Sequence, residues 1–329
     1  MEHPIQGLHH VTATVAGAQE DLDFAAGALG LRLVKQTVNF DNHGVYHFYY
    51  GDERGTPGTI WTTFPYRDRG VPVGQKGAGQ ITVTSLSVPA GSLDYWRRRL
   101  QSQGIQFSEP APRFGEESLL VTDPSGLLLE LVSSAGDRRE PWSGSGVPRE
   151  VGISGLHSVT LGSRAPAETR SLMSQVLGFR PVNETEEGIR LGIGDGAAGR
   201  VVDQVDASDA PPGRNGLGTV HHVAFAISDE DQQLRLRQEL IRLGLSVTEV
   251  MDRSYFRSIY FREPGGILFE VATMRPGFTI DEEPASLGSG LKLPPWEEPN
   301  REEIEAALPR VRLPKQQTTT DDTDRTDGS

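Results

Sequence analysis

The chain has 329 residues, a formal net charge of −13 at pH 7 and no cysteine. This acidic balance argues against a nucleic-acid partner, because a nucleic-acid-binding surface needs clustered lysines and arginines. The lack of cysteine excludes disulfides, thiolate metal ligands and a cysteine nucleophile. The sequence shows neither a signal-peptide core nor an apolar run long enough to cross a bilayer. We therefore expect a soluble cytoplasmic protein without nucleic-acid or membrane partners, and the sequence leaves a homo-oligomer open.

One pattern of predicted elements occurs four times along the chain. Each copy begins with a strand-like apolar segment, at residues 8–15, 81–88, 156–161 and 220–227. A helical segment follows each of these strands, at residues 19–29, 93–103, 167–177 and 230–243. Each helix ends at a glycine followed by a large apolar residue, which is a helix-terminating signal. These four glycines are Gly30, Gly104, Gly178 and Gly244. Short strands separated by turn signals complete each copy.

These copies predict an α+β fold of four βαβββ modules, which form two cup-like open barrels with the helices outside. Irregular or polar segments separate and follow the modules. The predicted divisions are an N-terminal pair of modules, a linker, a C-terminal pair of modules, an extension with a short helix and a disordered tail, at residues 1–136, 137–153, 154–275, 276–314 and 315–329. Asn300 and Glu303 are predicted to cap the short helix of the extension.

Two His-His pairs mark the strands that begin the first and fourth modules, in a chain with only 8 histidines. Successive side chains of a strand point to opposite faces. His10 therefore shares a face with Thr12, and His222 shares one with small alanines, which is typical of a cup lining. This parity favours His10 and His222 as metal ligands. His9 and His221 are then expected one layer back, as groups that contact the ligands or as core histidines.

A glutamate in the last strand of the fourth module completes a candidate ligand set. Glu270 stands in an apolar strand, and a buried carboxylate is costly unless a partner such as a metal compensates it. Glu130 is its counterpart in the second module, but that module begins without a histidine, and the third has Ser158 there. Only the first and fourth modules together supply two histidines and a glutamate. We therefore predict that these two modules form a metal-binding cup, and that the second and third form a metal-free one.

The four modules and the motifs at residues 8–12, 220–225 and 261–270 resemble the vicinal oxygen chelate superfamily, which includes glyoxalases, bleomycin resistance proteins and extradiol dioxygenases. Within it, the chain resembles dioxygenases that cleave hydroquinone and chlorohydroquinone rings. Further motifs add to this match, at residues 55–59, 62–65 and 75–77. The resemblance covers about residues 8–308. It implies Fe(II), with Mn(II) as the alternative, held by His10, His222 and Glu270.

The resemblance also implies groups that contact the ligands or the substrate, namely His9, Thr12, His221, Arg253 and Tyr260. The implied reaction joins a small aromatic substrate with O2, because two histidines and one carboxylate leave metal positions open for both. Tyr260 and Arg253 would hydrogen-bond their oxygen atoms, and His9 or His221 would transfer protons. Strand alternation independently places Tyr260 on the cup face, whereas Arg253 has the alternative of a loop ion pair with Asp252.

Other functions fit the same residues. A catechol extradiol dioxygenase would use the same triad. A manganese-dependent thiol transferase is a further relative, but such proteins use fewer modules per chain. A glyoxalase-type isomerase would carry a second glutamate in the cup, and residues 59–63 have none. A non-catalytic protein that binds aromatic ligands would need no metal, so it leaves the complete triad unexplained.

Overall fold

The computed structural model describes residues 4–67 and 69–314, so the predicted disordered tail lies outside the described residues. Within these ranges the strands form two eight-stranded sheets. The first sheet contains, in spatial order, β14 (Met251–Asp252), β15 (Arg257–Arg262), β16 (Leu268–Thr273), β13 (Thr219–Ile227), β1 (Ile5–Val15), β4 (Ile60–Pro65), β3 (Asn42–Gly51) and β2 (Arg32–Asn39). The second contains β10 (Arg180–Thr185), β11 (Gly188–Gly192), β12 (Val201–Asp206), β9 (Gly155–Ser163), β5 (Gln80–Pro89), β8 (Leu128–Ser134), β7 (Ser118–Thr122) and β6 (Phe107–Ser108).

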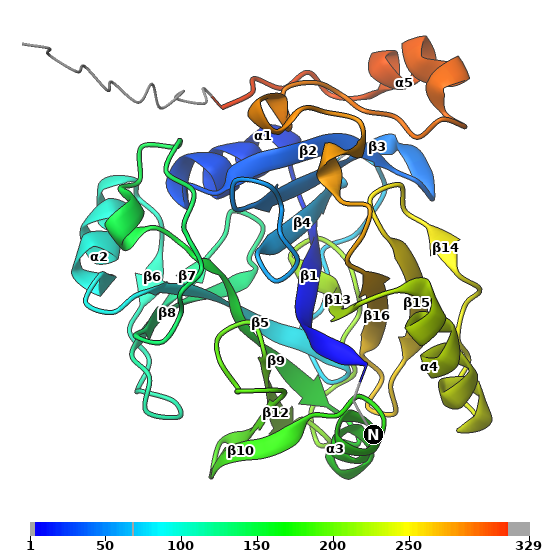
Figure 1. Cartoon of the computed structure of the whole chain (residues 1–329). Coiled ribbons are helices and arrows are strands. Elements are labelled where there is room, and N and C mark those ends of the chain that lie inside the picture. The colour runs from blue at the N-terminus through cyan, green and yellow to red at the C-terminus, as the bar shows by residue number, and fades with distance from the viewer. Residues whose placement is uncertain (1–3, 68, 315–329) are drawn as a thin grey trace, which may run out of the picture.

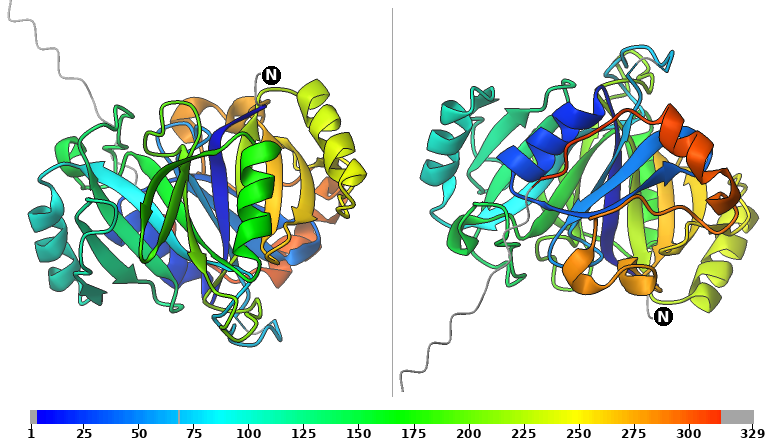
Figure 2. Two further views of the ribbon diagram at one scale, coloured as in Figure 1. Left: turned by 90° about the horizontal axis from the view of Figure 1, so that it is seen from below. Right: turned by 90° about the horizontal axis from the view of Figure 1, so that it is seen from above.

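The four predicted helices are confirmed and lie outside the sheets, with α2 and α4 at opposite ends of the molecule (Figure 2). They are α1 (Ala18–Leu22), α2 (Leu93–Ser102), α3 (Pro166–Gln175) and α4 (Glu230–Arg242). The first is shorter than predicted, because the chain continues as the π-helical turn η1 (Asp23–Ala28). That turn is rich in alanine and glycine, whose small side chains leave room for the wider winding. No helix within residues 4–67 and 69–314 is both long and apolar enough to span a membrane.

The first sheet combines the first and fourth modules, which are distant in sequence, and the second sheet combines the second and third modules (Figure 1). β1 of the first module runs antiparallel to β13 of the fourth at the centre of the first sheet. β5 and β9 make the same central pair between the second and third modules. The strand order therefore confirms the predicted pairing of the first module with the fourth. The division of the chain into an N-terminal and a C-terminal pair at residues 137–153 stays a prediction.

Three irregularities interrupt the register of the central β1–β13 pair, and two of them lie at a histidine. His9 is the extra residue on β1, between the partners of Phe225 and Ala224, and His221 is the extra residue on β13. The β5–β9 pair has bulges at the corresponding residues, Thr82 and His157. A bulge breaks the strict alternation of side chains, so adjacent histidines can approach one another here.

The apolar faces of the central strands form a core shared by both sheets. Phe225 of β13 is fully buried, and its ring lies 5.1 Å from that of Phe269 on β16. The ring of Phe179, which precedes β10 of the second sheet, lies 5.6 Å from Phe225. Burial of each such side chain contributes about 1.5–3 kcal/mol to the stability of the fold. Because side chains alternate along a strand, the opposite faces of these strands can carry polar groups.

The C-terminal extension packs over β2 and β3 at the edge of the first sheet (Figures 1 and 2). Its helix is α5 (Arg301–Ala307), and its short 3-10 helices are η3 (Phe278–Ile280), η4 (Pro284–Ser286) and η5 (Glu298–Asn300), while η2 (Arg149–Val151) lies in the linker. The predicted cap of α5 is wrong, since Asn300 makes no side-chain cap bond and Glu303 therefore completes no capping box. Because η5 runs directly into α5, Asn300 has φ −101° and ψ 10° rather than the extended conformation of a capping residue.

Candidate metal centre

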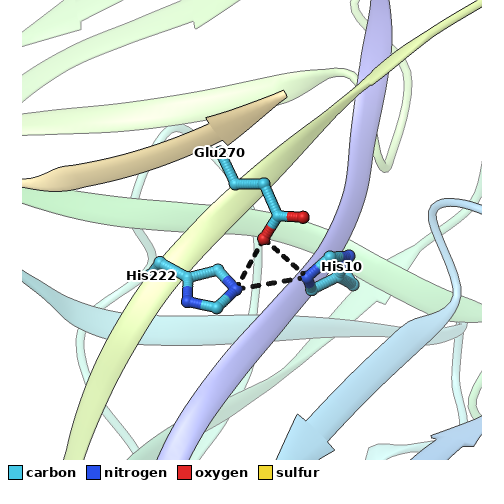
Figure 3. A group of neighbouring side chains, drawn as sticks. All are labelled: His10, His222 and Glu270. Carbon is cyan, nitrogen blue, oxygen red and sulfur yellow. Dashed lines mark hydrogen bonds and ion pairs between the residues drawn. The ribbon is translucent and has the colours of Figure 1, made fainter. Parts of the chain in front are cut away.

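Three buried side chains from neighbouring strands converge at one point of the first sheet (Figure 3). His10 lies on β1, His222 on β13 and Glu270 on β16, with 2%, 5% and 0% of their surfaces exposed. The Nε2 atoms of the histidines are 3.2 Å apart. Glu270 Oε2 lies 2.8 Å from Nε2 of His222 and 3.2 Å from Nε2 of His10. Ala224 separates His10 from Glu270 in the strand register, and its small side chain leaves room for them to meet.

This geometry fits a divalent metal. Glu270 Oε2 is buried and receives no hydrogen bond, although both imidazole nitrogens lie close to it. Metal bonds of about 2.1 Å at roughly right angles would place donor atoms about 3 Å apart, as observed. Two imidazoles and one carboxylate are also the donor set of a facial metal site. The triad therefore indicates a divalent-metal site.

The charge states of the triad suit metal binding, which requires a carboxylate and neutral imidazoles. Burial alone would raise the pKa of Glu270, but His10 and His222 hold it well below its ordinary value. Burial lowers the pKa of His222 despite the opposing effect of Glu270. At neutral pH Glu270 is therefore ionised and His222 is neutral.

His9 and His221 each contact one histidine of the triad through the ring nitrogen that faces away from Glu270. Nδ1 of His9 lies 2.9 Å from Nδ1 of His10, and Nδ1 of His221 lies 2.7 Å from Nδ1 of His222. Burial, followed by the adjacent triad histidine, lowers the pKa of His9 and of His221 to about 3. Such neutral partners fix the ring orientation of a ligand. Strict parity does not predict that His221 also lines the cavity, and the bulge explains it.

A cavity of about 360 Å³ opens in front of the triad, and Tyr260 and Arg253 form part of its wall. Tyr260 pairs with Glu270 in the strand register and faces the cavity, as alternation predicts. Its hydroxyl oxygen accepts a hydrogen bond of 3.1 Å from Arg253 Nε. Burial and then Glu270 raise the pKa of Tyr260, so its phenol stays protonated. The alternative pairing of Arg253 with Asp252 is wrong, because Arg253 pairs with Asp41 at 3.2 Å across the cavity mouth.

Thr12 is fully buried, and a chain of hydrogen bonds connects it through Thr62 to His47, a cavity residue that the sequence did not reveal. Thr62 donates a hydrogen bond of 2.9 Å to Thr12, and Thr62 Oγ1 lies 2.8 Å from Nε2 of His47. His47 and Tyr49 of β3 both line the cavity. The signal for them was the alternation within residues 46–50, which places both on one face of an aromatic strand.

Comparison with known proteins identifies the family. Residues 7–131 and 155–271 match the family model described as the Glyoxalase/Bleomycin resistance protein/Dioxygenase superfamily. The chain belongs to this superfamily. This confirms the predicted resemblance.

Homologues with similar length are ring-cleaving dioxygenases by name. The chain is 39% identical over 308 residues to "Chlorohydroquinone/hydroquinone 1,2-dioxygenase" of Sphingobium indicum, covering 91% of this chain and 95% of that protein. It is 42% identical over 310 residues to "Putative ring-cleaving dioxygenase MhqO" of Bacillus subtilis, covering 94% and 97%.

Solved structures agree with this family assignment. A crystal structure of a "putative dioxygenase" from Bacillus subtilis aligns with a TM-score of 0.88 at 41% identity, covering 94% of this chain and 99% of that one. Glyoxalase I from Zea mays aligns with a TM-score of 0.59 at 13% identity, covering 81% and 92%. The second likeness shows a shared fold.

The second cup of this superfamily member carries a different set of residues. Ser158 and Val83 occupy the register positions of His10 and His222. Glu130 accepts hydrogen bonds from Ser85 at 2.7 Å and from the Ser118 hydroxyl at 2.8 Å. An ion-pair network occupies the rest of this cup, formed by Arg113, Glu116, Arg190 and Asp203.

Proposed function

We propose that this protein is a non-haem, Fe(II)-dependent dioxygenase that opens the ring of a substituted hydroquinone with both atoms of O2. The observation that carries the proposal is the buried triad of His10, His222 and Glu270 at the inner end of a cavity. The homology to a chlorohydroquinone/hydroquinone 1,2-dioxygenase supports the substrate class. Mn(II) is the second candidate cation, because the same donors suit it.

The metal would supply a Lewis acid that favours the ionised form of a phenol and an electron donor for O2. The residues of the chain would bind and orient the substrate around it. Since Tyr260 accepts from Arg253, its own proton is free to be donated to a substrate oxygen. His221, which lines the cavity with a neutral ring, is placed to form a hydrogen bond with the substrate. His9, buried behind His10, is assigned the role of orienting that ligand.

The wall of the cavity suits one aromatic ring. Aromatic side chains line it from several strands and loops, among them Phe40, Tyr49, Phe64 and Phe256. Among the described residues of the lining, Glu270 is the single glutamate and Asp41 is already paired with Arg253. The second glutamate expected of a glyoxalase-type isomerase therefore has no counterpart here, which favours the dioxygenase.

The proposal is tested by loading the purified chain anaerobically with Fe(II) or Mn(II) and measuring O2 uptake. We expect about one metal per chain, as for one facial triad, and uptake with methylhydroquinone and chlorohydroquinone that exceeds uptake with catechol. Strong catechol cleavage without hydroquinone turnover would overturn the substrate class and spare the metal centre. Bound aromatic ligand without O2 uptake under any metal would point to a binding protein. Cytoplasmic location and a homo-oligomeric state stay predictions.

A further inference from the structure

His47 presents an unpartnered ring nitrogen in the cavity wall. Because Thr62 donates its proton to Thr12, the Thr62 oxygen is available as an acceptor for His47 Nε2, 2.8 Å away. This arrangement assigns the imidazole proton to Nε2 and leaves a lone pair on Nδ1. No hydrogen bond within residues 4–67 and 69–314 engages that Nδ1 atom. Burial lowers the pKa of His47 well below its ordinary value, so its ring is neutral and can accept.

His47 lines the cavity from β3, which β1 and β4 separate from His222 on β13. Thr12 and Thr14 of β1 pair with Thr62 and Phe64 of β4, and His222 lies opposite Thr12. Tyr49 pairs with Thr62, so His47 lies two residues further along the sheet, beside Phe64. Two residues of strand span about 7 Å, which is the length scale of one hydroxylated benzene ring.

Packing fixes the orientation of this histidine. Its ring centroid lies 4.0 Å from that of Tyr49 and 4.3 Å from that of Phe64. Two other polar groups of the cavity wall are already engaged: Asn39 donates to Tyr66 at 2.8 Å, and Asp41 pairs with Arg253. The His47 Nδ1 atom is therefore a rigid acceptor that remains available to a ligand.

We propose that His47 is the residue that recognises the second hydroxyl of a hydroquinone, accepting its hydrogen bond at Nδ1 while the first hydroxyl lies at the triad. This inference rests on the proposed function and names the group that selects para-dihydroxylated rings. A site built to hydrogen-bond a hydroxyl discriminates against ligands that lack it. The second cup offers an internal comparison. Gly188 and Arg190 occupy the positions that correspond to His47 and Tyr49, so the second cup has no histidine there, and Arg190 is paired with Asp203.

The test compares hydroquinone with 4-methylphenol, in which a methyl group of similar size replaces the second hydroxyl. Anaerobic Kd values are measured on the metal-loaded full chain for wild type, His47→Phe and His47→Asn. His47→Phe keeps the aromatic packing but removes the acceptor, whereas asparagine retains a polar atom close to Nδ1. His43→Phe is the matched control, because His43 lies on the same strand with 55% of its side chain exposed.

We expect wild type and His43→Phe to prefer hydroquinone by about tenfold or more, the usual effect of one buried hydrogen bond. His47→Phe should bind both ligands alike and keep its metal, and His47→Asn should recover part of the preference. If metal-loaded His47→Phe prefers hydroquinone as strongly as wild type does, the proposed role of His47 is overturned, and the proposed function is not. Wild-type protein that binds neither ligand and takes up no O2 would overturn the proposed function and this inference with it.

Discussion

Glu270 and Glu130 offer a matched test of the metal centre, because the chain carries the same Ser–Glu arrangement twice. Ser258 donates to Glu270, and Ser118, at the same register position, donates to Glu130. Replacement by glutamine keeps the side-chain volume and one oxygen acceptor but removes the negative charge. We predict that Glu270→Gln abolishes stoichiometric metal binding and that Glu130→Gln leaves it unchanged.

The size of the effect follows from the arrangement of the donors. The triad atoms already lie 2.8–3.2 Å apart, so binding needs little rearrangement and its free energy appears as stability of the folded state. A cation at 100 times its Kd stabilises a protein by about 2.7 kcal/mol. For a chain of 329 residues, with an unfolding entropy of about 0.7 kcal/mol/K, the corresponding rise in Tm is about 4 °C. Glu130→Gln disturbs hydrogen bonds with a net value of about 1 kcal/mol, and should lower Tm by only about 1–2 °C.

The assay is thermal unfolding of anaerobic protein with and without Mn(II) or Fe(II), with metal content measured after desalting. Wild type and Glu130→Gln should show the metal-dependent rise in Tm, and Glu270→Gln should show none. A full rise in Glu270→Gln would refute the assignment of the triad. Loss of the rise in a folded Glu130→Gln variant would show that the second cup holds the metal.

Three further predictions concern the ligands, the cavity wall and pH. His10→Ala and His222→Ala should each lose bound metal and O2 uptake, and full metal content in either would remove that residue from the site. Tyr260→Phe should keep its metal and slow turnover by about 10²-fold or less, and unchanged turnover would exclude a hydrogen-bonding role. Burial raises the pKa of Asp21 from 3.8 to about 7, so the folded chain holds a proton there that the unfolded chain releases. The free energy of unfolding should therefore fall as pH rises from about 4 to 7, and Asp21→Asn should remove that part of the fall in urea titrations.

The repeat and the convergence of the triad could be predicted from the sequence because their signals are local or periodic. Gly30 and its three counterparts adopt the left-handed conformation that ends each helix, with φ of 73° at Gly30. Strand parity depends only on alternation, and it placed His10, His222 and Tyr260 on the cavity side. The pairing of first and fourth modules followed from the distribution of histidines and glutamates, since no other pair could supply the triad.

The rest depends on register, which the sequence does not display. The bulges at His9 and His221 become visible only when β1 is paired with β13, and they bring each histidine against its neighbour in the triad. His47 escaped notice because its importance comes from Thr62 on another strand and from the cavity in front of it. The alternative of an Arg253–Asp252 ion pair is wrong for the same reason, because the actual partner Asp41 is distant in sequence.

The negative charge of the duplicated glutamate has different partners in the two cups. Arg113 and Arg253 stand at the same distance before Glu130 and Glu270, and the residue after each has positive φ, 54° at Phe114 and 63° at Ser254. Arg113 turns toward its glutamate, with 3.5 Å between the charged atoms. Arg253 instead binds Tyr260 and Asp41.

This difference leaves Glu270 fully buried with histidines as its only ion-pair partners among the described residues. A buried carboxylate without a cation costs several kcal/mol, and His222 is neutral at pH 7 because burial lowers its pKa. A divalent cation held by the triad would compensate this buried carboxylate. Because Arg253 turns away from Glu270, its guanidinium lies over the Tyr260 ring, 5.2 Å from the ring centroid, and donates to the Tyr260 hydroxyl. In the proposed reaction this contact would hold the phenol in place for the substrate.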